Sequence, residues 1–268
     1  MGVLNVTPDS FSDGGRFLDA EAAVAQGLRL AADGADVIDV GGESTRPRAE
    51  PVSVSEELRR VVPVVEGLAA EGVRISIDTT KSAVARSALA GGATVVNDVS
   101  ALRFDAELAG VVAEAGATCC LMHMRGEPGT MQDDPRYDDV VSEVKAFLEQ
   151  RLAFAVGEGI PEGRVWLDPG IGFGKTLEHN LELLRRLDEL VPIGRPVVVG
   201  SSRKSFLGRL TGRPEGERVP GTIATCVLAY ERGASVFRVH DVAEVHDALT
   251  VAAATVGPEA ACTIPTSR

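Results

Sequence analysis

Short runs of almost continuous apolar residues recur along the chain, and each is followed by a polar or glycine-bearing turn. Strands buried on both faces of a parallel sheet have this character, whereas strands with one wet face alternate apolar and polar residues. The runs therefore predict eight buried parallel strands, at residues 2–6, 36–40, 73–77, 94–98, 118–123, 164–168, 195–200 and 235–239.

Segments between these runs carry apolar residues at helical spacing. Ser53 and Glu56 can form a capping box at the start of one such segment. Its apolar face would consist of Leu58, Val61, Val62, Val65 and Leu68. The same spacing recurs at Leu177, Leu181 and Leu184, and again at Val245, Leu249 and Ala252. We therefore expect a helix after each strand.

This strand–helix repeat runs through the chain without a long linker or a change in composition. It predicts the α/β class and a (β/α)8 TIM barrel that forms a single domain over residues 1–257. A doubly wound open sheet is the alternative. Residues 258–268 show no periodicity, and we expect them to form a loose C-terminal tail.

Composition and charge disfavour several classes of protein. With 27 basic and 39 acidic residues the net charge is −12, so we expect no nucleic-acid partner. The four cysteines have neither the paired spacing of a zinc site nor the density of a secreted disulfide scaffold. No apolar run reaches the ~20 residues that span a bilayer, and the first residues do not read as a signal peptide. We expect a cytoplasmic protein with no membrane partner.

Polar side chains follow the predicted strands one after another. The carboxyl ends of barrel strands meet at one mouth, where function resides. Hydroxyl residues such as Thr79 are also explained as helix caps or strand ends, but the charged and amide residues together predict a site. Its members would be Asn5, Asp78, Asn97, Asp168, Lys204, Arg238 and His240.

These residue types suit a flat heterocycle bound edge-on. Asp78, Asn97 and Asp168 offer acceptors for an amino group and a ring N–H, and Lys204 offers a donor to a ring carbonyl. Arg46, Arg238 and His240 could bind an anion such as a phosphorylated leaving group. A hard cation near Asn5 is more plausible than a zinc centre. The glycine-rich stretches lack the spacing of ATP or dinucleotide loops.

Eight ordered motifs resemble those of the dihydropteroate synthase family of pterin-binding enzymes, from residue 2 to about 255: GVLNVTPDSFSDGG, GGESTRP, IDTTK, VVNDVSA, LMHMRGEPGTMQ, LDPGIGFGK, GSSRKSFLG and RVHDV. The resemblance implies a transferase that joins 6-hydroxymethyl-7,8-dihydropterin pyrophosphate to 4-aminobenzoate. It also implies Mg²⁺ as cofactor and a homodimer. The pyrophosphate would leave first, and the arylamine would then attack a pterin cation.

The resemblance further implies a role for each matching residue. The pterin would be bound by Asp78, Asn97, Met122, Asp168, Phe173, Lys204 and Arg238. The pyrophosphate would be bound by Asn5, Arg238 and His240, with Asn5 also a ligand of Mg²⁺. The aminobenzoate would be bordered by Phe11, Thr45, Pro47 and Ser205. The catalytic residues would be Asp13, Arg46, Asp78, Asp168 and Lys204. Phe11 would be exposed in the free enzyme and would cover the aminobenzoate on loop closure.

Two departures from the family pattern stand out. Arg48 replaces the usual glycine after Pro47. Family members also usually carry further residues before the first strand, and we expect their addition to increase stability. A pterin-binding methyltransferase that acts with a corrinoid protein is an alternative, but it would not need the SFSDGG, STRP and SRKS motifs together. A second alternative is a non-catalytic paralogue that binds pterin without turnover.

Overall fold

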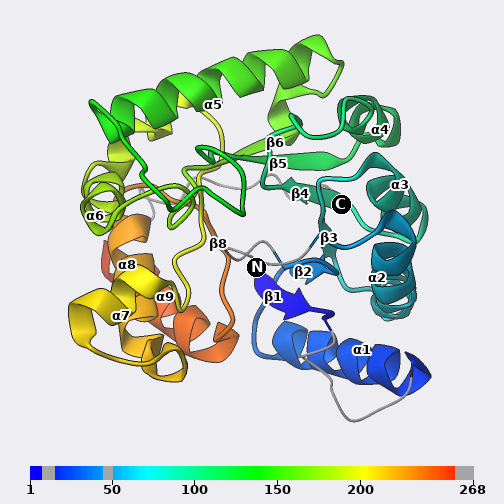
Figure 1. Cartoon of the computed structure of the whole chain (residues 1–268). Coiled ribbons are helices and arrows are strands. Elements are labelled where there is room, and N and C mark those ends of the chain that lie inside the picture. Colours follow the sequence, from blue (N-terminus) through cyan, green and yellow to red (C-terminus); the bar gives the residue numbers. More distant parts are fainter. Residues whose placement is uncertain (8–15, 45–50, 257–268) are drawn as a thin grey trace.

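The structure, a computed structural model, describes residues 1–7, 16–44 and 51–256. Its strands are β1 (Gly2–Asn5), β2 (Ile38–Gly41), β3 (Ile75–Asp78), β4 (Val95–Asp98), β5 (Thr118–Met122), β6 (Val165–Asp168), β7 (Val198–Val199) and β8 (Val236–Phe237). Its α-helices are α1 (Arg16–Ala32), α2 (Val54–Ala70), α3 (Ser82–Ala90), α4 (Leu108–Ala115), α5 (Val140–Gly157), α6 (Leu177–Arg185), α7 (Ser205–Thr211), α8 (Val219–Glu231) and α9 (Val242–Val256). Helices surround the strands on all sides (Figure 1).

The strands form a closed ring. β1 to β6 pair in chain order, all parallel, and β7 pairs with β8. A parallel bridge between Leu167 and Val197 joins β6 to the β7 side, and a bridge between Gly2 and Val239 joins β8 to β1. The N–H of Val3 also donates to the carbonyl of Val239 at 2.9 Å. The predicted (β/α)8 barrel is therefore confirmed, and the open sheet is wrong.

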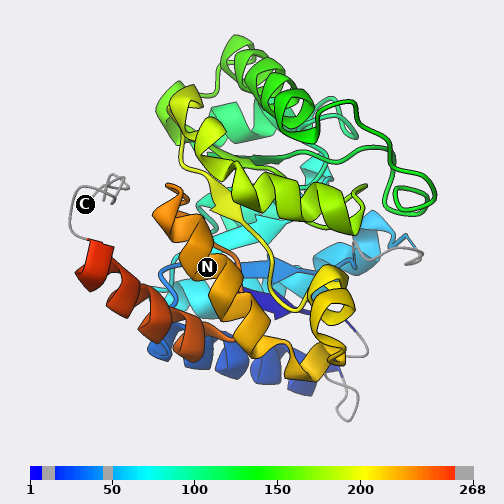
Figure 2. The ribbon, with the colours of Figure 1, turned by 90° about the vertical axis from the view of Figure 1, so that its left-hand side faces the viewer.

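The predicted elements need correction at several strand boundaries and in the number of helices. The second and third strands begin two residues later and end one residue later than predicted, at Ile38–Gly41 and Ile75–Asp78. The connection from β7 to β8 holds two helices, α7 and α8, rather than one. Figure 2 shows the barrel from the side, with the strands running between the flanking helices.

Alternation along the strands separates an inner from an outer face. The inner layer is a small apolar cluster of Val37, Val95, Cys120, Trp166, Val198 and Val236. Residues two positions further along a strand point to the same face. They are Asp39, Asn97, Met122, Asp168, Gly200 and Arg238. The barrel interior is therefore apolar in its middle layer and mainly polar at the carboxyl ends of the strands.

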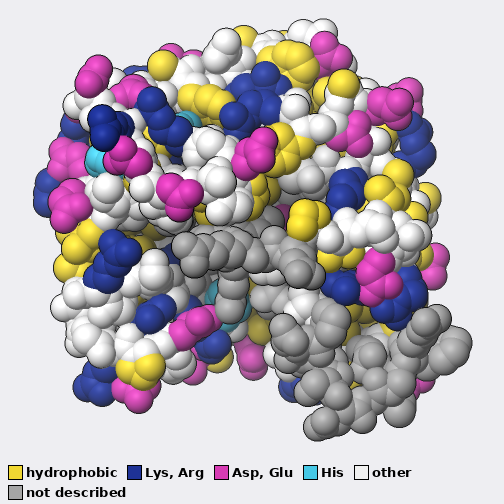
Figure 3. Space-filling view, viewed as in Figure 1, with side chains coloured by type: hydrophobic (Ala, Val, Ile, Leu, Met, Phe, Trp, Pro, Cys, Tyr) yellow, Lys and Arg dark blue, Asp and Glu magenta, His cyan; other side chains and the backbone are white. Residues whose placement is uncertain are grey.

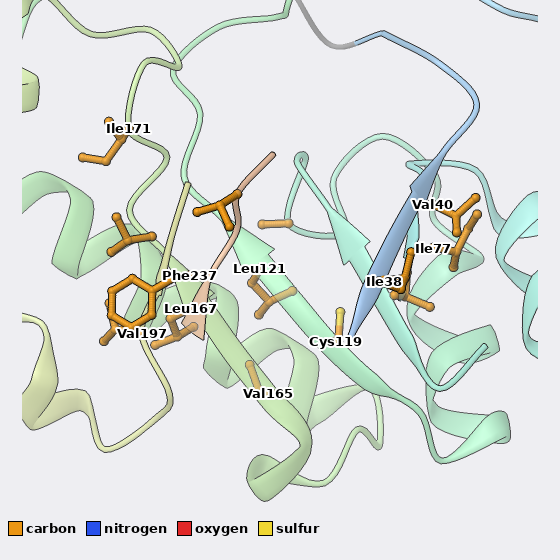
Figure 4. Packing of buried hydrophobic residues seen from close by; sticks show 14 of the residues in the cluster. Ile38, Val40, Ile77, Cys119, Leu121, Val165, Leu167, Ile171, Val197 and Phe237 are labelled. Carbon is orange, nitrogen blue, oxygen red and sulfur yellow. The ribbon is translucent and has the colours of Figure 1, made fainter. Parts of the chain in front are cut away.

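The outer faces of the strands form the main core with the helices. Ile38, Val40, Ile77, Leu121 and Leu167 are almost fully buried in it, and Figure 4 shows their packing. Branched aliphatic side chains fill this layer because both faces of the sheet are covered. The polar residues at the mouth thus stand on a rigid, closely packed support.

Helix α2 bears out its predicted pattern in most respects. The hydroxyl of Ser53 accepts a hydrogen bond from the N–H of Glu56 at 3.3 Å and caps the helix. The carboxylate of Glu56 binds Arg59 and Arg60 at 2.7 and 2.8 Å. The predicted apolar face is buried at Val61, Val65 and Leu68. Within the part of the chain that the structure describes, no helix is both long and apolar enough to cross a membrane.

Candidate active site

Arg238 is the centre of a hydrogen-bonded cluster at the mouth of the barrel. It directly follows β8, and its Nε donates to Oδ2 of Asp39 at 2.6 Å. Its Nη2 donates to Oδ2 of Asp78, the last residue of β3, at 2.8 Å. Asn97, on β4, donates from Nδ2 to the same oxygen of Asp39 at 3.1 Å. Three predicted site residues, Asp78, Asn97 and Arg238, therefore lie in one hydrogen-bonded cluster with Asp39, which was not predicted.

Asp39 is a member of this cluster that sequence reasoning missed. It lies inside β2 with its side chain fully buried, and for this strand only the polar residues that follow it, GGESTRP, were considered. The sequence does contain one signal for it, an acidic residue within the apolar run VIDV. An acid in a buried strand normally needs a charged or hydrogen-bonding partner, so its presence there indicates a specific contact. The partner is Arg238, which is 199 positions away in the chain.

Burial changes the protonation of the two predicted acids. It raises the pKa of Asp78 to about 7, against the opposing charge of Arg238 and with the support of nearby Asp39. Burial also raises the pKa of Asp168, while a hydrogen bond from the N–H of Gly170 at 2.6 Å favours its charged form. The charge of Lys204 favours the ionised Asp168 as well. Asp78 can thus change its protonation state near neutral pH.

The loop after β6 carries one wall of the site. Lys204 places its Nζ 4.0 Å from the centre of the Phe173 ring, a cation–π contact. Gly172 has φ +84°, and a side chain there would lie 3.2 Å from Lys204 Cδ. Asn180 accepts from the N–H of Gly172 at 2.6 Å, and Gln132 donates to its carbonyl at 2.5 Å. These contacts hold the loop in the conformation in which Phe173 meets Lys204.

Met122 forms the apolar part of the same wall. It is buried in a cluster with Val99, Met124 and Met131, and Phe173 packs against this cluster. Methionine side chains adapt their shape and contact aromatic rings favourably. Met122 and Phe173, predicted to contact the faces of a heterocycle, are therefore neighbours in the structure.

A buried lysine, Lys175, supports the loop after β6 through hydrogen bonds. Nζ of Lys175 lies 2.9 Å from Nδ1 of His123 and donates to the carbonyl of Phe173 at 3.0 Å. Burial lowers the pKa of Lys175 to about 7, and burial together with the charge of Lys175 lowers the pKa of His123 to about 2. His123 therefore stays neutral and acts as a structural hydrogen-bond partner.

Asp98 points away from the mouth although it adjoins Asn97. Its carboxylate accepts hydrogen bonds from the N–H groups of Ser100 and Leu102 at 2.7 and 2.6 Å. These bonds stabilise a turn in which Ala101 and Leu102 both have positive φ, a conformation that is costly for residues with a side chain. Asp98 is thus a structural acid.

The loops after β7 and β8 are joined by two side-chain contacts. Ser202 Oγ lies 3.0 Å from Nδ1 of His240 and accepts from its backbone N–H at 3.1 Å. Arg203, with φ +56°, forms a two-point ion pair with Asp241, in which Nε donates at 2.9 Å. These contacts fix the loop that carries Lys204 relative to His240.

The remaining predicted residues are less constrained or lie outside the described residues. Asn5 is exposed at the end of β1, and Ser205 is exposed at the start of α7. Asp13, Arg46, Phe11, Thr45 and Pro47 lie outside the described residues, as do Arg48 and the tail at 258–268. Figure 3 shows the face that carries the mouth, with acidic and basic side chains interspersed around it.

A protein-only metal cage is not seen among residues 1–7, 16–44 and 51–256, since no group of three His, Cys, Asp or Glu side chains lies close enough together. Asn5 offers a hard amide oxygen at the exposed end of β1. Mg²⁺ typically binds one or two protein oxygens together with substrate phosphates and water. The donor set therefore fits an ion that is held jointly with a phosphorylated substrate.

Comparisons with known proteins agree with this arrangement. The model of the pterin binding enzyme family matches residues 1–240. The dihydropteroate synthase of Escherichia coli K12 is 48% identical over 257 residues, covering 96% of this chain and 91% of that protein. The Mycobacterium leprae enzyme of the same name is 49% identical over 261 residues, covering 95% and 92%.

Solved structures give the same result. The Xanthomonas albilineans dihydropteroate synthase with 4-aminobenzoic acid is 51% identical, with a TM-score of 0.90, covering 96% of this chain and 93% of that one. The same bacterium's enzyme in complex with 7,8-dihydropteroate is 48% identical, with a TM-score of 0.87 and the same coverage. With a family match over most of its length and close relatives of one name, this chain belongs to the dihydropteroate synthase family of pterin-binding enzymes.

Proposed function

We propose that this chain condenses 6-hydroxymethyl-7,8-dihydropterin pyrophosphate with 4-aminobenzoate to give 7,8-dihydropteroate and pyrophosphate, a step of folate biosynthesis. The observation that carries the proposal is the cluster in which Arg238 joins the buried Asp39 and the partly buried Asp78 beside Asn97. Buried acceptors of this kind suit a heterocycle with several N–H donors. Solved relatives in complex with 4-aminobenzoic acid and with 7,8-dihydropteroate support the choice of substrates.

In this proposal the pterin lies with its polar edge against Asp78, Asn97 and Asp168. Lys204 donates to the ring carbonyl, and Met122 and Phe173 contact the ring faces together with the stem of Arg238. A site that pairs all of these groups discriminates strongly against analogues that lack one donor, because a buried acceptor would be left unpaired.

The reaction needs no protein nucleophile. The bond between the pterin methylene carbon and the leaving oxygen breaks, and the electron pair leaves with pyrophosphate. The arylamine nitrogen attacks the resulting cation and then loses a proton. The chain's part is electrostatic: Asp39, Asp78 and Arg238 carry a net charge of −1 when both acids are ionised, which favours a cation nearby.

Basic groups and a metal ion would stabilise the leaving group. His240, oriented by Ser202, and Arg238 would contact the pyrophosphate. Mg²⁺, held by Asn5 and the pyrophosphate, would neutralise charge that develops on the leaving oxygens. From the segments that lie outside the described residues, Asp13, Arg46, Phe11, Thr45 and Pro47 would complete the site, with Ser205 beside the aminobenzoate.

The test is release of pyrophosphate by the purified chain with Mg²⁺ and the pterin pyrophosphate, with and without 4-aminobenzoate. We expect release to depend on the arylamine and to yield dihydropteroate. Lys204→Met should lower kcat/KM about 100-fold or more. Lys145→Met on α5 is the matched control and should behave as the wild type. Binding of the pterin without any turnover would favour the non-catalytic paralogue instead.

The assembly is a separate part of the proposal. We propose a homodimer that forms through α8 and α9, which pack against each other and expose Leu228 and Val251 at 46% and 67%. Exposed apolar side chains on adjacent helices favour a protein contact. Light scattering of the wild type and of Val251→Glu checks it, and a monomeric wild type would contradict it. The cytoplasmic location and the domain bounds, residues 1–257, stay predictions.

A further inference from the structure

In the proposed reaction Asp39 contributes only its charge. It nevertheless binds Arg238 and Asn97, and both of these residues contact the substrate in the proposal. Both hydrogen bonds that it receives, from Arg238 Nε and Asn97 Nδ2, end on one oxygen, Oδ2. Within the described residues its other oxygen, Oδ1, has no hydrogen-bond partner. The carboxylate is fully buried, so it is an expensive choice for stability alone.

The contact with Asp39 determines which atom Asn97 can offer to a ligand. A carboxylate at neutral pH only accepts hydrogen bonds, so Asn97 must direct its NH₂ group toward Asp39 at 3.1 Å. The carbonyl oxygen of Asn97 is then directed away from Asp39. Asn97 is thereby committed to act as an acceptor toward whatever lies at the mouth.

The same carboxylate fixes the plane of Arg238. The guanidinium binds Asp39 through Nε at 2.6 Å and Asp78 through Nη2 at 2.8 Å. Two contacts from two strands, β2 and β3, hold a planar group in one orientation. With Asp39 removed, Arg238 would keep a single contact and could rotate about it.

We propose that Asp39 is a positioning residue of the pterin site, which commits Asn97 to accept a hydrogen bond from a ring N–H and holds Arg238 flat across the mouth. The inference rests on the proposed function, because it concerns the same bound pterin. Asp39 would thereby also determine ligand specificity: a pterin with a hydrogen-bond donor opposite Asn97 is bound, and an analogue with an acceptor there is rejected.

The first test compares Asp39→Asn with Asp36→Asn, the same change at an exposed residue two positions before β2. Calorimetry with 6-hydroxymethylpterin gives the affinity. We expect Asp39→Asn to weaken binding about tenfold, the difference between charge-assisted and neutral hydrogen bonds. Asp36→Asn should bind as the wild type. An Asp39→Asn variant that is folded and binds with unchanged affinity would overturn the proposal.

The pH profile provides a readout that a merely structural residue would not move. Asp78 is faced by Arg238 from the β8 side, by Asp39 on β2, by Glu57 on α2 and by Asp98 on β4. Removing the like charge of Asp39 should let Asp78 ionise at lower pH. The acid limb of pterin binding should therefore move to lower pH in Asp39→Asn, and an unmoved limb would count against the proposal.

A second variant covers the case in which Asp39→Asn does not fold. In Asn97→Asp two carboxylates face each other at the distance of the present hydrogen bond, so one must take a proton before a ligand can bind. We expect the affinity of Asn97→Asp for pterin, taken as a ratio to that of the wild type at the same pH, to rise as the pH falls, and a ratio that does not change with pH would refute the role of Asp39. If the wild type binds no pterin at all, the proposed function fails and not this inference alone.

Discussion

Replacing Lys81 by methionine measures how much one partly buried ion pair contributes to the stability of the mouth. Glu57, in the first turn of α2, has a fully buried side chain. It accepts a hydrogen bond from the hydroxyl of Thr79 at 2.7 Å and forms an ion pair with Lys81. Lys81 also binds Glu43 at 2.5 Å. The variant keeps the length of the side chain and removes its charge.

The expected loss follows from this geometry. Breaking a buried ion pair by removing one partner costs about 3–5 kcal/mol, because the other charge stays buried. The side chain of Lys81 is 22% exposed, and Glu57 keeps its hydrogen bond from Thr79, so we expect a loss slightly below that range, about 2–3 kcal/mol. For a chain of this size this lowers Tm by roughly 4–10 °C.

Urea unfolding at neutral pH is the assay. Burial opposes the charged form of Lys81, but hydrogen bonds to Glu43 and Glu57 outweigh it and raise its pKa. The contribution is therefore complete below the ordinary lysine pKa of about 10.4, and it is lost as the pH rises through the higher folded-state value. The difference between wild type and Lys81→Met should stay constant across neutral pH and shrink only in strong alkali.

Two further variants decide whether the buried charge is the cause. Arg86→Met, on α3, removes an exposed ion pair with Glu114, whose two side chains are 61% and 71% exposed, and should cost no more than about 0.5 kcal/mol. The double variant Glu57→Gln with Lys81→Met has no buried charge and should recover much of the loss. A loss in Lys81→Met as small as in Arg86→Met, or a double variant that is no more stable than the single one, would refute the reasoning.

Two other substitutions test the support of the β6 loop. Gly170 has φ +69°, and a Cβ there would lie 1.9 Å from the carbonyl oxygen of His123. Gly170→Ala should therefore lower the free energy of unfolding by about 3 kcal/mol or more, measured in a thermal melt, and should also weaken pterin binding. A variant as stable as the wild type would contradict this. Burial lowers the pKa of Lys175 to about 7, so the unfolded chain, with a lysine pKa of about 10.4, binds more protons between these values. The free energy of unfolding should therefore rise with pH over this window, and urea titrations should show a smaller rise in Lys175→Met; equal slopes would count against the shifted pKa.

The barrel could be predicted from the sequence because each strand leaves a local apolar signal. The pattern was weakest where the ring closes, since the predicted strands at 195–200 and 235–239 shorten to Val198–Val199 and Val236–Phe237. Closure there depends on pairing between the first and last strands, which no local pattern encodes.

The candidate site was predictable only in part, for a related reason. Asp78, Asn97 and Arg238 were found because they lie at the carboxyl ends of predicted strands or directly after them. Asp39 and Lys175 were missed, since what marks them is a partner far away in the chain: Arg238 for the first and His123 for the second. Buried polar groups are identified by their partners, and partners are a property of the fold.

The alternation along the strands makes the chemistry of the mouth independent of the packing that supports it. On β4, Asn97 faces the mouth while Val96, its neighbour, is buried in the core with the helices. A substitution at Asn97 therefore changes which ligand the mouth binds and does not disturb the packing of the helices. An insertion of one residue before Asn97 would instead exchange the two faces. Such a barrel can evolve a new reaction by point substitutions at the carboxyl ends of its strands. Insertions or deletions within the strands are not tolerated in the same way, because they exchange the two faces.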